Sequence, residues 1–115
     1  MPIAALITDL FFVSKVKGTA DVLNLPLKVV RSADAVMAEV DAGAKLVIID
    51  MNASGVDPAE AIRRCKSSPT PPRVIAYLSH VQTDLLDAAR TAGADLVLPR
   101  SKFSADLPEL LQSTR

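Results

Sequence analysis

The chain has 115 residues, which is the length of one small domain with a single core. Its 13 basic and 13 acidic residues leave no net charge, which argues against a nucleic-acid or membrane-surface binder, because such proteins need an excess of basic residues on one face. Only three residues are Phe and one is Tyr, so the core must be mainly aliphatic, and the single cysteine, Cys65, excludes an internal disulfide.

Five short apolar segments follow one another along the chain, and each is rich in Val, Ile or Leu. They are residues 3–8, 27–30, 46–49, 74–78 and 96–98. Their apolar residues are nearly continuous rather than alternating with polar ones, which is typical of strands that are buried on both faces of a parallel sheet. We therefore predict five parallel strands.

The stretches between these segments have apolar residues at helical spacing. The clearest helix start is Asp57, an N-cap residue that is followed by Pro58 at the first helical position. The helix after the fourth strand should end at Gly93, a typical C-cap. A short last helix begins at Ser104 or at Asp106, and the sequence does not decide between these two starts.

Strands that alternate with helices indicate right-handed crossovers onto a parallel sheet. We expect an α/β fold of the flavodoxin-like type, in which five strand–helix units form a doubly wound five-stranded parallel sheet of order 2-1-3-4-5. Residues 1–115 should make up a single domain. In such sheets, ligands bind beyond the carboxyl ends of the strands, here between strands one and three.

Two carboxylates follow those two strands. Asp9 comes after the first strand and Asp50 after the third, so the fold brings them close together. Neighbouring carboxylate oxygens suit a hard cation such as Mg²⁺, and an Asp beside such a cation can attack phosphorus. An Asp after a strand is also a common turn or N-cap residue. Both interpretations stay open for Asp9, whereas for Asp50, at the end of the most hydrophobic strand, we favour a site.

Over nearly its whole length, the chain resembles a response-regulator receiver domain of two-component signalling. The resemblance is carried by Leu-Val-Ile-Ile-Asp at residues 46–50 and by Ala-Gly-Ala-Asp at residues 92–95, which leads into Leu-Val-Leu-Pro-Arg. The first segment resembles the strand that carries the family's phosphoacceptor. The second resembles the turn before the strand that leads to the family's active-site lysine. Their order and spacing within five strand–helix units make the resemblance specific.

This resemblance implies roles for five residues. Asp50 is the candidate phosphoacceptor, and Asp9, Asp50 and Asn52 form a candidate but incomplete Mg²⁺ site. Arg100 stands where the family has its lysine, as a phosphate contact or, equally well, as an ion-pair partner of Asp9. Ser79 follows the position of the family's Thr or Ser and is a weak candidate for the same contact. We expect alternation along the fourth strand to point its hydroxyl elsewhere, unless a bulge re-aims it.

Four positions depart from the pattern of the family. Leu10 replaces a second acid, Leu78 replaces the Thr or Ser, Val97 replaces an aromatic switch residue, and Ser101 replaces a proline. The first three changes remove a metal ligand, a phosphate contact and the ring that reports the switched state. We therefore expect an atypical receiver, or pseudo-receiver, that is weakly or not phosphorylated. Mg²⁺ is the one cofactor implied, and the missing acid argues against it.

The predicted function is a stand-alone, non-enzymatic receiver-like domain that acts in a phosphorelay through protein contact. Its partner would be a sensor kinase, an output protein or a second copy of the chain, bound through the fourth helix, fifth strand and fifth helix. One alternative is a functional phosphoacceptor response regulator that uses Asp50. Another is a flavodoxin-like domain that binds a small ligand, but the apolar segment at residues 9–12 lacks the glycines or hydroxyls of a phosphate loop.

The chain has no targeting segment and no apolar run of the roughly 18 to 20 residues that a membrane span needs. Together with the single cysteine, this indicates a cytoplasmic protein with neither a membrane nor a nucleic acid as its partner. His80 follows the fourth strand near the same edge of the sheet, and it is most simply a solvated loop residue.

Overall fold

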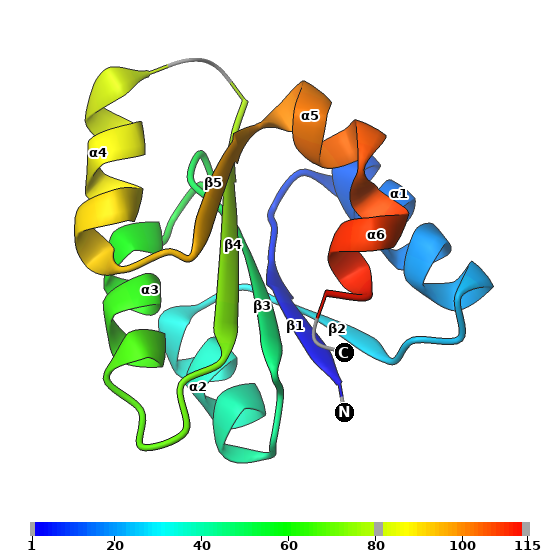
Figure 1. Ribbon diagram of the computed structural model, residues 1–115, viewed down its shortest axis with the longest axis horizontal. Coiled ribbons are helices and arrows are strands. Elements are labelled where there is room, and N and C mark those ends of the chain that lie inside the picture. Colours follow the sequence, from blue (N-terminus) through cyan, green and yellow to red (C-terminus); the bar gives the residue numbers. More distant parts are fainter. Residues whose placement is uncertain (1, 80–81, 114–115) are drawn as a thin grey trace.

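The computed structural model of the protein describes residues 2–79 and 82–113, so His80 lies outside the described residues. Five strands form one parallel sheet in the order β2-β1-β3-β4-β5 (Figure 1). The strands are β1 (Ile3–Leu6), β2 (Leu27–Val30), β3 (Leu46–Asp50), β4 (Arg73–Leu78) and β5 (Leu96–Pro99). The predicted flavodoxin-like α/β fold and its strand order are confirmed.

Helices cover both faces of this sheet (Figure 1). They are α1 (Leu10–Val22), α2 (Ala33–Asp41), α3 (Pro58–Lys66), α4 (Thr83–Ala92), α5 (Arg100–Ala105) and α6 (Leu107–Leu111). Asp57 caps α3 by accepting the N–H of Glu60 at 3.1 Å, as predicted. Gly93 ends α4 with a φ of 108°, a left-handed conformation that favours glycine.

Asp106, one of the two predicted starts, is the N-cap of α6, but the last helical segment is longer than the expected short helix. It begins already at Arg100 and is divided into α5 and α6. Phe103, Leu107 and Leu111 recur every four residues and are all buried, so one apolar stripe runs through both helices. Pro108 has no N–H to donate to the carbonyl of Ser104, which explains why the first helix stops and a second one follows.

The core has two parts, one on each face of the sheet. Under α2, α3 and α4 it consists of aliphatic side chains, together with Cys65 and Met51. Under α1, α5 and α6 it also contains three aromatic rings, Phe12, Tyr77 and Phe103. The prediction of an aliphatic core therefore holds for one face only. Successive strand residues point to opposite faces, so Ile48 and Asp50 point toward the aromatic side.

None of the helices in residues 2–79 and 82–113 combines the length and the apolarity that crossing a membrane requires. The carboxyl ends of the strands, where the site was predicted, face α5 and the first turn of α1 (Figure 1). The candidate functional site therefore lies at this edge of the sheet.

Candidate functional site

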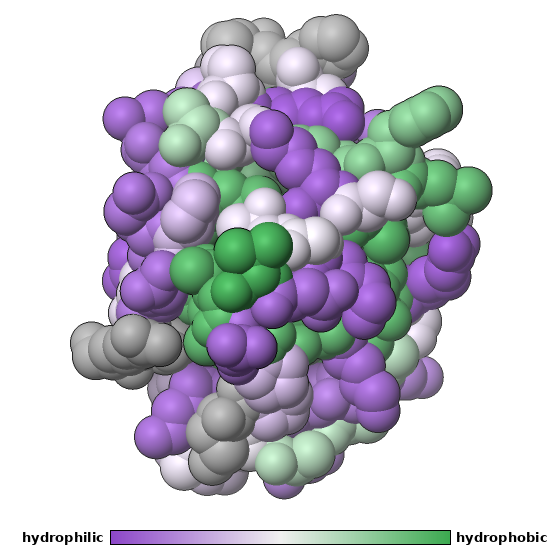
Figure 2. Space-filling view, turned by 90° about the vertical axis from the view of Figure 1, so that its right-hand side faces the viewer, coloured by the Kyte–Doolittle hydropathy of each residue, from purple (hydrophilic) through white to green (hydrophobic). Residues whose placement is uncertain are grey.

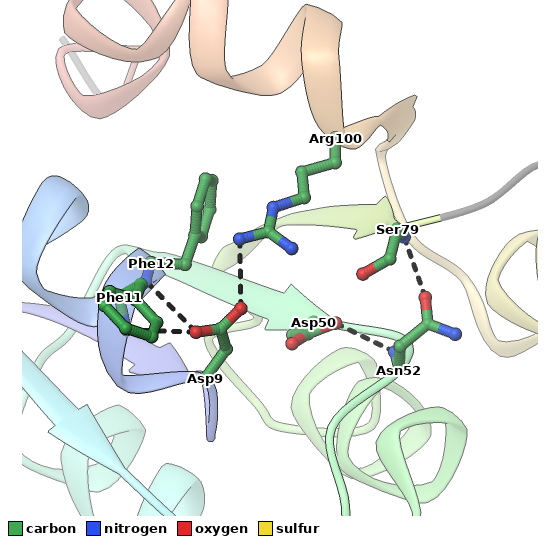
Figure 3. Close-up of polar contacts among 7 residues, drawn as sticks. All are labelled: Asp9, Phe11, Phe12, Asp50, Asn52, Ser79 and Arg100. Atoms are coloured by element: carbon green, nitrogen blue, oxygen red, sulfur yellow. Dashed lines mark hydrogen bonds and ion pairs between the residues drawn. The ribbon is translucent and has the colours of Figure 1, made fainter.

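Asp9 is the N-cap residue of α1. Its Oδ1 accepts the backbone N–H of Phe11 at 3.0 Å and, more weakly, that of Phe12 at 3.4 Å. Its Oδ2 accepts a hydrogen bond from Arg100 Nη2 at 3.0 Å (Figure 3). Burial by itself would raise the pKa of Asp9, but these hydrogen bonds outweigh it and lower the pKa. Of the two interpretations of Asp9, the N-cap is confirmed, and both carboxylate oxygens are occupied.

Arg100 is the first residue of α5, and it bridges two elements that are far apart in the sequence. Besides its ion pair with Asp9, its guanidinium carbon lies 4.4 Å from the centroid of the Phe12 ring, a cation–π contact. The predicted ion pair between Asp9 and Arg100 is therefore present. These two contacts hold the guanidinium at the carboxyl edge of the sheet.

Asp50 is the last residue of β3 and is only 4% exposed. Its Oδ1 accepts the backbone N–H of Asn52 at 2.8 Å (Figure 3). Burial raises the pKa of Asp50, and the hydrogen bond from Asn52 and the charge of Arg100 offset only part of this rise. Asp50 thus lies at the carboxyl end of β3, where the site was predicted, but its ionised form is poorly solvated.

Asn52 joins the loop after β3 to the segment after β4. Its side-chain Oδ1 accepts the backbone N–H of Ser79 at 2.8 Å, and its Nδ2 donates to Gln82 Oε1 at 2.9 Å. Figure 3 shows the Ser79 hydroxyl directed toward the space between Asp50 and Arg100. The expectation that Ser79 points away is wrong. Tyr77 is buried on the aromatic face and Leu78 on the aliphatic face, so alternation returns Ser79 to the side of Tyr77 and Asp50.

Three of the four positions that depart from the family pattern bring no polar group to the site. Leu10 begins α1 and is 66% exposed, and Leu78 is buried on the aliphatic face. Val97 is half-buried on β5 and also packs against the aliphatic core. The three side chains therefore leave Asp9, Asp50, Ser79 and Arg100 to define the chemistry of this edge.

The arrangement of these residues fits Mg²⁺ poorly. Both oxygens of Asp9 are bonded to protein groups, and Leu10 offers no second acid beside it. The guanidinium of Arg100 also places a positive charge beside Asp9. Within the described parts of the chain, no three His, Cys, Asp or Glu side chains are arranged to hold a metal ion. We therefore derive no chemical step through Mg²⁺.

A cavity of about 580 Å³ opens beside Arg100. Its lining includes Phe12 and Lys15 of α1, Ser79, and Arg100 and Ser104 of α5. Two positive side chains and no carboxylate line this cavity, so solvent reaches the cationic side of the site. A second cavity, of the same volume, lies at the opposite end of the sheet near Pro72, away from Asp50.

Tyr77 is the neighbour of Asp50 that the sequence did not reveal. It is the Cα partner of Asp50 in the pairing of β3 with β4, and its side chain is 1% exposed. In the sequence it reads as one more apolar strand residue. The available signal is that it is the only tyrosine of the chain and that it stands directly before Leu78.

No protein-family model matches the sequence, and neither does any curated protein. Solved structures do match the fold. The receiver domain of NtrX from Brucella abortus aligns with a TM-score of 0.81 at 15% identity, over 99% of this chain and 97% of that one. A CheY-like response regulator receiver domain protein from Methanospirillum hungatei JF-1 aligns with a TM-score of 0.79 at 13% identity, over 98% of this chain and 94% of that one.

The phosphorylated cyanobacterial phytochrome response regulator RcpA aligns with a TM-score of 0.75 at 18% identity, over 98% of this chain and 87% of that one. These similarities extend over nearly the whole chain and include the strand that ends at Asp50. At such low identities they establish the fold and not the chemistry. The chain thus has the fold of a response-regulator receiver domain.

Proposed function

We propose that this chain is a non-enzymatic receiver-type signalling domain that works through protein contact and is weakly or not phosphorylated. The fold supports the signalling class. The proposal that phosphorylation is weak or absent rests on the ion pair of 3.0 Å between Arg100 and Asp9. This ion pair occupies the carboxylate that would otherwise bind a metal ion.

Phosphoryl transfer to a carboxylate depends on positive charge that neutralises the incoming group, and a metal ion is the usual source of that charge. Here Asp9 is bonded to α1 and Arg100, and Leu10 offers no second acid. Asp50 is buried, so its carboxylate is less available as a nucleophile. A guanidinium can contact phosphate, but it provides one charge in a fixed position. These features support slow phosphorylation.

Apolar surface for protein contact is present on two sides of the molecule. The edge strand β5 is half-buried along Leu96, Val97 and Leu98, next to α4 and α5, the face we propose for a sensor kinase, an output protein or a second copy. Figure 2, which looks onto the side where α1 lies, shows green apolar groups among purple ones. Phe11 and Val22 of α1 are 89% and 83% exposed.

The test is a titration of the ¹⁵N-labelled protein with Mg²⁺ and then beryllofluoride, followed by amide spectra. We expect the spectrum to stay nearly unchanged, because Asp9 is paired with Arg100 and Leu10 offers no second acid for a metal ion. The matched control is Asp50→Asn, which keeps the shape of the side chain and removes the acceptor. A saturable shift around Asp50 that is absent from the control would show a working phosphoacceptor and overturn the proposal.

The second candidate is a functional phosphoacceptor that uses Asp50, Ser79 and Arg100. It is favoured by the Ser79 hydroxyl, which faces the space where a phosphoryl group on Asp50 would lie (Figure 3). The same titration with Ser79→Ala separates the two candidates. If the unmodified chain binds beryllofluoride and Ser79→Ala binds it several-fold more weakly, the second candidate replaces the first.

A flavodoxin-like ligand-binding function has less support. The backbone N–H groups of Phe11 and Phe12, which a phosphate at the start of α1 would need, already donate to Asp9. A thermal-shift screen with nucleotides and flavins tests this alternative, and we expect none of them to raise the melting temperature.

A further inference from the structure

Tyr77 carries a buried hydroxyl next to Asp50. The side chain is 1% exposed, and its oxygen has no hydrogen-bond partner within the described part of the chain. Buried hydroxyl groups are nearly always hydrogen-bonded, so an unpaired one needs an explanation. The ring of Tyr77 belongs to the aromatic core, but neither the fold nor the proposed function explains its hydroxyl.

Asp50 is the Cα partner of Tyr77 in the pairing of β3 with β4, so the two side chains lie next to each other on the same face of the sheet. Burial, and after it the charge of Asp50, raises the pKa of Tyr77. Tyr77 therefore keeps its proton and can donate it in a hydrogen bond. The backbone N–H of Asn52 takes Oδ1 of Asp50, and none of the described residues donates a hydrogen bond to Oδ2.

The ring of Tyr77 is held in place by two other rings. It stacks on Phe103 of α5 with centroids 4.6 Å apart and an interplanar angle of 16°. It also lies against the ring of Phe12 of α1, with centroids 5.0 Å apart and an interplanar angle of 49°. The guanidinium of Arg100 in turn lies over the ring of Phe12. A continuous packed path thus leads from Asp50 through Tyr77 into α5.

We propose that Tyr77 is a positioning residue for Asp50, which holds the carboxylate through its hydroxyl and couples it to α5 through Phe103. The hydroxyl reaches Asp50 from the aromatic face of the sheet, opposite to the aliphatic face on which Leu78 is buried. The ring supplies an aromatic contact that Val97 cannot make. This inference rests on the proposed function in one respect, that Asp50 is the group whose state the domain transmits.

Tyrosine emission provides a direct readout, because the chain has one tyrosine and no tryptophan. A carboxylate that accepts a hydrogen bond from a tyrosine hydroxyl quenches the emission of that tyrosine. We expect Asp50→Asn to increase the emission, since an amide oxygen is a much weaker proton acceptor. Asp9→Asn is the matched control and should leave the emission unchanged, because Asp9 is bonded to α1 and Arg100 instead. Unchanged emission in Asp50→Asn would overturn the contact.

The coupling to α5 is tested with amide shifts. We expect Asp50→Asn to move the amide signals of α5 in the otherwise unmodified chain and to lose most of that effect when Tyr77→Phe is also present. Tyr77→Phe keeps the ring and removes only the hydroxyl, so the core stays filled. Equal α5 shifts with and without the hydroxyl would overturn the coupling. Neither experiment uses Mg²⁺, phosphate or a partner, so each can fail or succeed independently of the beryllofluoride titration.

Discussion

Two carboxylates at opposite ends of the sheet show opposite electrostatic behaviour. Asp95 stands before β5, at the amino ends of the strands, and its Oδ2 accepts the N–H of Val74 at 2.7 Å and Lys66 Nζ at 2.8 Å. Burial favours a higher pKa for Asp95, but these two bonds outweigh it and lower the pKa. Asp50, at the carboxyl end, has one such bond, and its pKa is raised.

The difference separates a structural carboxylate from a candidate functional one. Asp95 ties α3 to β4 and β5, since Lys66 also donates to the carbonyl of Pro72 at 2.9 Å. Gly93 belongs to the same turn, and a Cβ there would lie 3.1 Å from Lys66 Cγ. The Ala-Gly-Ala-Asp turn therefore resembles the receiver family because of packing and hydrogen bonds. A buried carboxylate with few partners, such as Asp50, contributes no comparable stability and is typical of sites.

Removing the structural carboxylate gives the largest effect we expect. Asp95→Ala leaves the N–H of Val74 and the ammonium of Lys66 without their acceptor, and should lower the free energy of unfolding by about 2 kcal/mol. The backbone contact accounts for most of this loss, because solvent screens the partly exposed ion pair. Urea unfolding at neutral pH, followed by circular dichroism, measures it.

The control for this variant is Asp34→Ala. Asp34 pairs with Arg64 at 2.7 Å, but its side chain is 89% exposed, so the loss should be close to zero. Because the pKa of Asp95 is lowered in the folded state, its contribution is present above the ordinary pKa and is lost as the pH falls through the folded value. If Asp95→Ala costs no more than Asp34→Ala, Asp95 is not a structural clamp.

For Asp50, at the carboxyl end of the sheet, we expect stability to depend on pH in the opposite direction. The folded state raises the pKa of Asp50, so it binds a proton more tightly than the unfolded chain does. Stability therefore falls as the pH rises from the ordinary pKa of 3.8 through the raised value, and the penalty is fully present above it. Asp50→Asn removes this penalty and should raise the free energy of unfolding at neutral pH, by less than Asp95→Ala lowers it.

Unfolding of both proteins between about pH 4 and pH 7 measures this effect. The two stability curves should converge toward the acidic end, where Asp50 is protonated. Asp9→Asn is the control, since Asp9 has a lowered pKa and its loss should not be stabilising. A variant Asp50→Asn that is less stable than the unmodified chain at neutral pH would contradict the interpretation of Asp50 as a carboxylate whose ionised form is destabilised by burial.

The sequence was sufficient for the sheet and for the place of the site, because continuous Val, Ile and Leu runs and the Asp57–Pro58 start are local signals. It also indicated the pairing of Asp9 with Arg100 as one of two alternatives. It missed Tyr77, since nothing local reveals which residue of a neighbouring strand pairs with Asp50. The predicted direction of Ser79 was wrong for a similar reason, because it depends on which faces of the sheet Tyr77 and Leu78 occupy.

The smallest change in stability is expected for Leu10→Asp, which tests whether the carboxyl end lacks only one ligand. Leu10 is 66% exposed at the start of α1, so the variant should change the free energy of unfolding by no more than about 0.5 kcal/mol. A second carboxylate beside Asp9 adds the oxygen that Mg²⁺ lacks and competes for Arg100. We expect amide signals around Asp9 and Asp50 to shift saturably with Mg²⁺ in Leu10→Asp but not in Leu10→Asn. If neither variant responds, the ion pair between Asp9 and Arg100, rather than the missing acid, excludes the metal.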